Sequence, residues 1–246
     1  MTEARHYPHA PITEALVDLR VNYGSAISLD KLKNFGTQIK ADYPHENTRE
    51  MVQANVNFGQ AQAQTSRSTI GYIFHSADRR QAVQARLDGF TFSRFAPYQD
   101  WPRLISEAKR LWTIFLKCLR PQTVTRIAVR YINQINLPYR ERTLTFEHYL
   151  RTFPATALEE DIALEEFLLR LVMPQQDLSA KLILTEALLP PKDDHLGVLL
   201  DIDLFRENAS VDSHSEEIWD ILETFRERKN KYFEASLTDA ARGLFA

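Results

Sequence analysis

Four segments in the first half of the chain have the pattern of β-strands. In residues 11–23, for example, Val17, Leu19 and Val21 alternate with polar side chains. A period of two predicts a strand with one buried face. The four segments are residues 11–23, 52–58, 69–75 and 81–87, and within the second we expect Val52, Ala54, Val56 and Phe58 to point inward.

Two other segments of the first half repeat their apolar residues at helical spacing. Residues 29–43 follow Ser28, which is a suitable N-cap. Residues 101–116 form the clearest helical pattern in the chain, and Asp100 precedes them as a second N-cap candidate. Because Pro102 suits the first turn of a helix, the sequence predicts a long amphipathic helix that begins near residue 101.

The second half of the chain repeats this order of elements. We expect a strand at 123–137, a short helix at 145–150, strands at 164–172, 180–187 and 197–205, and a final helix that carries Ile218 to Phe233. The predicted order of elements is then the same in each half: a strand, a helix, three strands and a long helix. This order predicts an α+β fold in which long helices cover one face of antiparallel sheet.

We further expect two structural repeats, residues 1–121 and 122–246, because the two halves have the same order of elements. No glycine- or serine-rich linker separates them, which favours one fused unit. TATA-binding-protein-like and helix-grip architectures have this order, an analogy of fold that carries no function.

Composition excludes several kinds of chemistry. The chain has 246 residues and 7 glycines, none of them close enough to others for a glycine-rich phosphate loop, which excludes P-loop and dinucleotide motifs. The 7 histidines have no zinc-site spacing with one another or with the single Cys118, which we expect to be an inert buried thiol. We expect no cofactor.

With neither an N-terminal signal pattern nor an apolar run long enough for a bilayer, the expected location is the cytoplasm.

Charge is distributed unevenly along the chain. Of 30 Lys and Arg and 33 Asp and Glu, 18 basic and 11 acidic residues precede Leu137, which leaves 12 basic and 22 acidic residues beyond it. Such polarity indicates either charged partners or complementarity between the halves, within a monomer or an oligomer.

Several segments resemble an uncharacterised, sporadically distributed family of bacterial and archaeal proteins. They are Tyr7–Ala15, Pro97-Tyr98 with Trp101, Arg126–Asn133, Leu200–Asp203, and Lys229-Asn230 with Phe233-Glu234. The resemblance spans nearly the whole chain and implies a single coherent unit. Because the family has no established activity, the resemblance implies no mechanism.

Arginine and amide side chains are frequent on the predicted outward strand faces. The candidate contact residues there are Arg20, Asn22, Asn55, Asn57, Arg86, Arg126 and Arg130. Side chains of these types reach phosphates and base edges, so the face is a candidate site for an anionic peptide or a nucleic acid. An ordinary solvated sheet face is the alternative interpretation. On the predicted long helix, Arg103, Arg110 and Lys117 recur every seven residues and form either a second contact stripe or a solvated helix back.

Two charged pairs lie on predicted strands in the second half. Arg126 and Arg130 point the same way, and either Glu14 or Asp201 is a possible counter-charge, so a structural ion pair competes with an anion site. Asp201 and Asp203 also share a face and could bind Mg²⁺, although no third acid is evident apart from the neighbouring-strand candidates Glu166 and Glu186.

These observations favour a non-catalytic binding module over an enzyme. We expect a macromolecular partner, a protein in the first place and a nucleic acid in the second, because net charge is negative and the polar face has no aromatic series for base stacking. Pairing with a second copy of the chain stays open. The alternative is metal-dependent nucleotidyl or phosphoryl transfer at Asp201 and Asp203.

Overall fold

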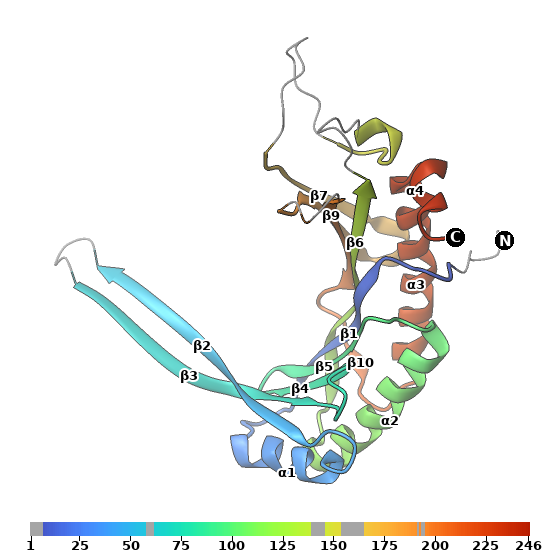
Figure 1. The fold of residues 1–246 in the computed structure, drawn as a ribbon. Helices are drawn as coiled ribbons and strands as arrows, with labels where there is room; N and C mark the ends of the chain where they lie inside the picture. Colours follow the sequence, from blue (N-terminus) through green and yellow to red (C-terminus); the bar gives the residue numbers. More distant parts are fainter. Residues whose placement is uncertain (1–6, 58–61, 139–145, 154–164, 191, 193–194) are drawn as a thin grey trace.

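The computed structural model describes residues 7–57, 62–138, 146–153, 165–190, 192 and 195–246. The side chains of residues 53–57 and 62–65, although their backbone is in strands, are outside the described part. Figure 1 shows the arrangement, in which helices lie along one face of a large sheet and one long hairpin projects from the body.

The chain forms a mixed α+β structure, as the sequence predicts. The strands are β1 (Ile12–Asn22), β2 (His45–Asn57), β3 (Gln62–His75), β4 (Gln81–Arg86), β5 (Gly89–Phe95), β6 (Thr123–Pro138), β7 (Leu168–Gln175), β8 (Ala180–Leu188), β9 (His195–Arg206) and β10 (Val211–Asp212). The helices are α1 (Leu29–Ile39), α2 (Trp101–Leu119), α3 (Glu217–Ser236) and α4 (Asp239–Gly243), with 3₁₀ turns η1 (Phe146–His148) and η2 (Gln176–Leu178). None of the helices in the described part is long and apolar enough to cross a membrane.

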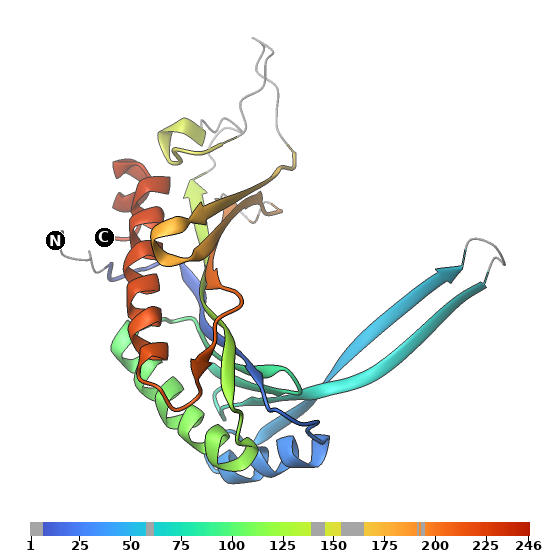
Figure 2. The same cartoon turned by 180° about the vertical axis from the view of Figure 1, so that it is seen from behind.

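All strands belong to one antiparallel sheet with the order β2-β3-β4-β5-β1-β6-β9-β8-β7, and β10 pairs with β6. Strands β1 and β6 lie side by side at its centre, with Val17 opposite Val129. The helices pack on one face, and the opposite face curves between the β2–β3 hairpin and the β7–β9 strands (Figure 2). We call this opposite surface the helix-free face.

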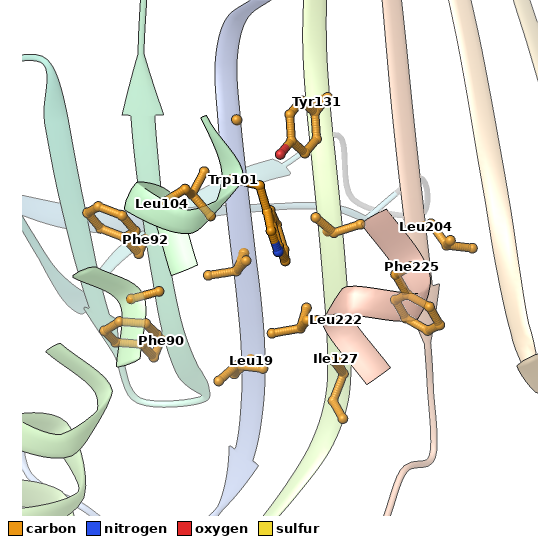
Figure 3. Close-up of a cluster of buried hydrophobic side chains, with 14 of the residues drawn as sticks. Leu19, Phe90, Phe92, Trp101, Leu104, Ile127, Tyr131, Leu204, Leu222 and Phe225 are labelled. Carbon is orange, nitrogen blue, oxygen red and sulfur yellow. The ribbon is translucent and has the colours of Figure 1, made fainter. Parts of the chain in front are cut away.

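The hydrophobic core fills the space between the sheet and the helices. Figure 3 shows side chains of β1, β5, β6 and β9 meeting those of α2 and α3. Leu19, Ile127 and Leu222 are fully buried there. The start of α2 is fixed as expected, since the Asp100 side chain accepts a hydrogen bond from the Arg103 backbone amide at 2.8 Å.

Three expectations about individual elements need correction. Strand β5 was not predicted, so four strands rather than three follow α1 in the first half. Only a 3₁₀ turn is found within 146–150, while residue 145 lies outside the described part. Val52 is 56% exposed instead of inward, because β2 continues beyond the body into the projecting hairpin, where no helix covers it.

Candidate functional site

The helix-free face carries paired charges at its centre, which we call the central ion cluster. It consists of Asp18 on β1, Arg86 on β4, Arg126 on β6 and Asp203 on β9, with Thr91 of β5 beside them. Asp18 Oδ1 accepts hydrogen bonds from Arg86 Nη2 at 2.8 Å and Thr91 Oγ1 at 2.7 Å. Asp18 Oδ2 accepts from Arg126 Nη1 at 2.8 Å. The Arg126 Nη2 atom lies 3.5 Å from Asp203 Oδ2, so the cluster ties the two halves of the sheet together.

Burial and pairing act in opposite directions on the carboxyl groups of this cluster. Burial alone would raise the pKa of Asp18, but Arg86, the hydrogen bond from Thr91 and Arg126 together hold that pKa below its ordinary value of 3.8. At Asp203 burial dominates and raises the pKa to about 6, although the neighbouring arginines oppose this. Asp18 is therefore the ionised centre of the cluster.

A second ion pair lies beside the cluster on β6 and β9. Arg130 Nε and Nη2 donate to Asp201 Oδ1 and Oδ2 at 2.9 and 2.6 Å, which is the two-bond geometry that guanidinium and carboxylate groups favour. The expectation that Asp201 is a counter-charge for this arginine pair is confirmed for Arg130. Arg126 is paired with Asp18 and Asp203 instead.

The carboxylates proposed as metal ligands are oriented as expected but are bound to arginines. Asp201 and Asp203 both lie on the helix-free face, whereas Glu186 on β8 is aligned with Leu200 and therefore lies on the other face. Glu166 is exposed. In the described parts of the chain, no group of three or more His, Cys, Asp or Glu is placed to hold a metal ion. This geometry favours ion pairing over metal binding.

The remaining predicted contact residues of the sheet are dispersed. Arg20 and Asn22 are exposed on β1 at the margin of the cluster, with Arg20 Nη1 3.6 Å from Asp88 Oδ2. Asn55 and Asn57 are on β2 in the projecting hairpin, in the portion whose side chains lie outside the described part. Arg86, Arg126 and Arg130 are thus the predicted residues that the fold brings together.

The predicted basic stripe of α2 lies on the helix-bearing side of the molecule, away from the cluster. Arg103, Arg110 and Lys117 are exposed on this helix. The Arg110 Nη2 atom lies 2.7 Å from Glu107 Oε1 and 3.0 Å from Asp42 Oδ2. The stripe therefore does not share a surface with the central ion cluster.

Exposed apolar side chains gather on the two outermost strands of the sheet. The large hydrophobic residues that are exposed in the described part are Met51, Val52, Leu168, Leu171, Val172 and Leu244. All except Leu244 lie on β2 or β7, the ends of the strand order. On β7, Leu168 and Val172 are aligned with Ala187 and Ile183, and these positions form an apolar extension of the helix-free face.

A cavity of about 880 Å³ lies on the other side of the sheet and was not predicted from the sequence. It is bounded by α3, the beginning of α2, and the strands β1 and β6. Four of the segments that carry the family resemblance meet in its lining, which includes Tyr7, Tyr98, Trp101, Tyr131, Asn133 and Lys229. The fifth supplies the Leu200 carbonyl oxygen, which accepts a hydrogen bond from Asn133 Nδ2 at 2.9 Å. The sequence did contain a signal for this cavity. Asn133 on β6 and Lys229 on α3 are polar residues at positions where the pattern of each element predicts an apolar side chain.

No model of a known protein family matches the chain, and no curated protein matches it either. The functional interpretation therefore rests on the geometry of these surfaces.

Proposed function

We propose that the protein is a non-catalytic binding module that engages another protein through the helix-free face and the adjacent edge strand β7. One observation carries this proposal: five of the six exposed large hydrophobic residues in the described part lie on the two outermost strands. Apolar side chains gathered at a sheet edge are a typical feature of a protein interaction site.

Strand β7 offers backbone groups as well as side chains to a partner. In the described part it pairs with β8 alone. An extended partner segment can add to such an edge, with main-chain hydrogen bonds supplying affinity and alternate side chains supplying specificity. Leu168 and Val172, which are 72% and 50% exposed, would contact such a segment on the helix-free face.

The ion pairs near the sheet centre favour a protein over a nucleic acid. The guanidinium groups of Arg86 and Arg126 both form ion pairs with Asp18, and Arg126 also pairs with Asp203. Their positive charges are therefore already engaged and are not free to bind phosphate groups. Arg130 is the most exposed of the three, with 41% of its side chain accessible, and it too is paired. These fixed charges would orient a partner rather than provide most of the affinity.

The strand order supports two fused repeats, residues 1–121 and 122–246. Strands of the first half occupy β2 to β1 in the sheet and strands of the second half β6 to β7, so the boundary falls between β1 and β6. Each half has one long helix after its strands, α2 or α3, and the short α4 follows α3 in the second half. We therefore favour a TATA-binding-protein-like or helix-grip-like arrangement, as an analogy of fold that carries no function.

We place this module in the cytoplasm, because its lone cysteine, Cys118, does not form an intramolecular disulfide. Burial raises the pKa of the Cys118 thiol, which lowers its reactivity. Metal-dependent phosphoryl transfer at Asp201 and Asp203 is the weaker candidate, because both carboxylates face arginines.

The test compares edge-strand variants in affinity capture from the source cells. Leu168→Glu with Val172→Glu should abolish retention of the partner, whereas Leu244→Glu, which changes the exposed hydrophobic residue outside the edge strands, should retain it. Size-exclusion chromatography with light scattering distinguishes a second copy of the chain from a different protein. Equal capture by both variants would reject the proposal. Retained nucleic acid, with binding that falls steeply with salt and on Arg130→Ala, would instead favour the second class of partner.

A further inference from the structure

The cavity on the helix-bearing side is lined by a buried amine that forms no ion pair in the described part of the chain. Lys229 of α3 is 6% exposed, and its Nζ lies 3.5 Å from the centroid of the Tyr131 ring. This cation–π contact is the interaction that the described residues provide for the amine, which forms no hydrogen bond or ion pair with them. Burial and the nearby Arg226 charge lower the pKa of Lys229 to about 7, although the Glu234 carboxylate opposes this. A buried amine normally either pairs with an acid or loses its proton, so a carboxylate bound beside Lys229 would favour its charged form.

The two arginines of the cavity lining have acidic partners, whereas Lys231, which also lines it, is exposed to solvent. Arg226 Nε donates to Glu223 Oε1 at 2.8 Å, and Arg242 Nε donates to Glu234 Oε2 at 2.9 Å. These pairs hold the wall of the cavity in place, and Lys229 is the buried basic group of the lining that forms no ion pair in the described part of the chain.

A second unsatisfied group lines the same cavity. Asn133 is 1% exposed, and its Nδ2 donates to the Leu200 carbonyl oxygen, which fixes the orientation of the amide. Its Oδ1 atom is buried and has no hydrogen-bond partner in the described part of the chain. A buried acceptor of this kind normally has a partner, and a ligand that carries a donor group could supply it.

Aromatic residues form the walls around these two groups. Tyr98 and Tyr131 join through their hydroxyl groups at 2.9 Å, and their rings meet edge to face. Trp101 stands on the same side of the sheet as Tyr131 (Figure 3), and its indole Nε1 donates to Glu223 of α3. The cavity thus combines aromatic side chains with a buried amine and an amide acceptor of fixed orientation.

From this arrangement we infer that the cavity binds a small organic carboxylate with a flat apolar body, whose carboxylate pairs with Lys229 and whose donor group reaches Asn133 Oδ1. A single ammonium group suits a carboxylate better than a phosphate, which usually takes several donors from arginines or backbone amides. The volume of 880 Å³ is within the range of small-molecule sites. The site is separate from the helix-free face and goes beyond the proposed protein contact.

The test uses benzoate and 4-hydroxybenzoate as probes on the full chain, and the signal is tryptophan fluorescence, to which Trp101 in the cavity wall contributes beside Trp112 and Trp219. Both should bind saturably, and 4-hydroxybenzoate should bind more tightly because its hydroxyl group can donate to Asn133. Neutral benzamide should bind at least about tenfold more weakly than benzoate. Inorganic phosphate should not compete.

Lys229→Met should weaken benzoate binding at least about tenfold, whereas Lys109→Met should leave it unchanged. Lys109 is a matched control, because its Nζ lies 5.2 Å from the Trp219 ring centroid outside the cavity lining. Absence of saturable carboxylate binding up to about 10 mM would overturn the inference. Equal binding of benzoate and benzamide, or binding that survives Lys229→Met in a folded protein, would also overturn it.

Discussion

The Arg86 guanidinium group on β4 reaches across the intervening strand β5 and lies 2.8 Å from the Asp18 carboxylate on β1. Gly89 of β5 is aligned with Arg86 on one side and Arg20 on the other. A Cβ atom at Gly89 would collide with the Leu19 carbonyl oxygen and would lie 3.1 Å from Arg86 Nη2. The absence of a side chain at Gly89 therefore permits the ion pair across the strand.

Gly89→Ala is expected to destabilise the protein through this collision. The obstacle at Leu19 is backbone, which cannot move aside as a flexible side chain would. We expect the free energy of unfolding in urea to fall by more than about 1 kcal/mol. Gly243→Ala is the matched control, since nothing lies within 4 Å of a Cβ atom there, and it should be neutral. Equal stability of the two variants would contradict the close approach at Gly89.

Asp18→Asn should remove the charge that neutralises Arg86 and Arg126. Breaking a buried pair leaves a charge uncompensated, so a loss of about 3–5 kcal/mol in the free energy of unfolding is expected at neutral pH. Because the pKa of Asp18 is lowered from 3.8 in the folded state, its stabilising contribution is present above that value and is lost as pH falls through the lower folded pKa. The difference between wild type and variant should therefore shrink in acid.

Urea titrations at several pH values measure this difference. Arg20→Met provides the comparison, because the Arg20–Asp88 pair is exposed on both sides and should contribute no more than about 1 kcal/mol. A pH-independent effect of Asp18→Asn would show that the loss arises from packing rather than charge.

The sequence predicts most of the fold because periodicity directly reflects which side chains meet the core. The alternation in 11–23 corresponds to β1, and the helical spacing after Asp100 corresponds to α2. The same logic failed at β5, where Phe90 and Phe92 alternate with polar residues but only two residues, Leu87 and Asp88, separate this strand from β4. The dipeptide Asp88-Gly89 is a typical hairpin-turn signal at this boundary, and the prediction of a single strand overlooked it.

The site was harder to predict, because pairing across strands depends on the register. The sequence shows that Arg86 and Arg126 point outward, but their shared partner Asp18 follows only from the alignment of β4, β5, β1 and β6. The cavity depends on a longer-range contact, since Asn133 and Lys229 come together only when α3 packs over β6. Neither residue belongs to a local motif that indicates a pocket.

Glu186 on β8 should make stability depend on pH in the opposite direction to Asp18. The residue is fully buried, and neither carboxyl oxygen has a hydrogen-bond partner in the described part of the chain. Burial raises its pKa from 4.5 to about 7, so ionisation costs stability as pH rises from 4.5 through 7. Glu186→Gln should gain about 3 kcal/mol relative to wild type between acid and neutral pH.

Chemical unfolding from pH 4 upward tests this prediction about Glu186. Glu166→Gln, at an exposed position, is the control and should stay within about 0.5 kcal/mol of wild type. A constant difference between Glu186→Gln and wild type across the range would mean that the carboxyl group has a partner in the folded protein.

Lys229→Met is expected to stabilise the protein even though it should weaken carboxylate binding. The pKa of Lys229 is lowered from 10.5 to about 7, so its burial costs most stability below pH 7, and this cost decreases as pH rises through 10.5. Methionine keeps an apolar stem without the charge but loses the contact with Tyr131. The net gain at pH 7 should be roughly 2–4 kcal/mol, and it should diminish toward pH 10. Urea unfolding of both proteins over this pH range measures it, and a destabilised variant at pH 7 would show that the ammonium group has a structural role in the free protein.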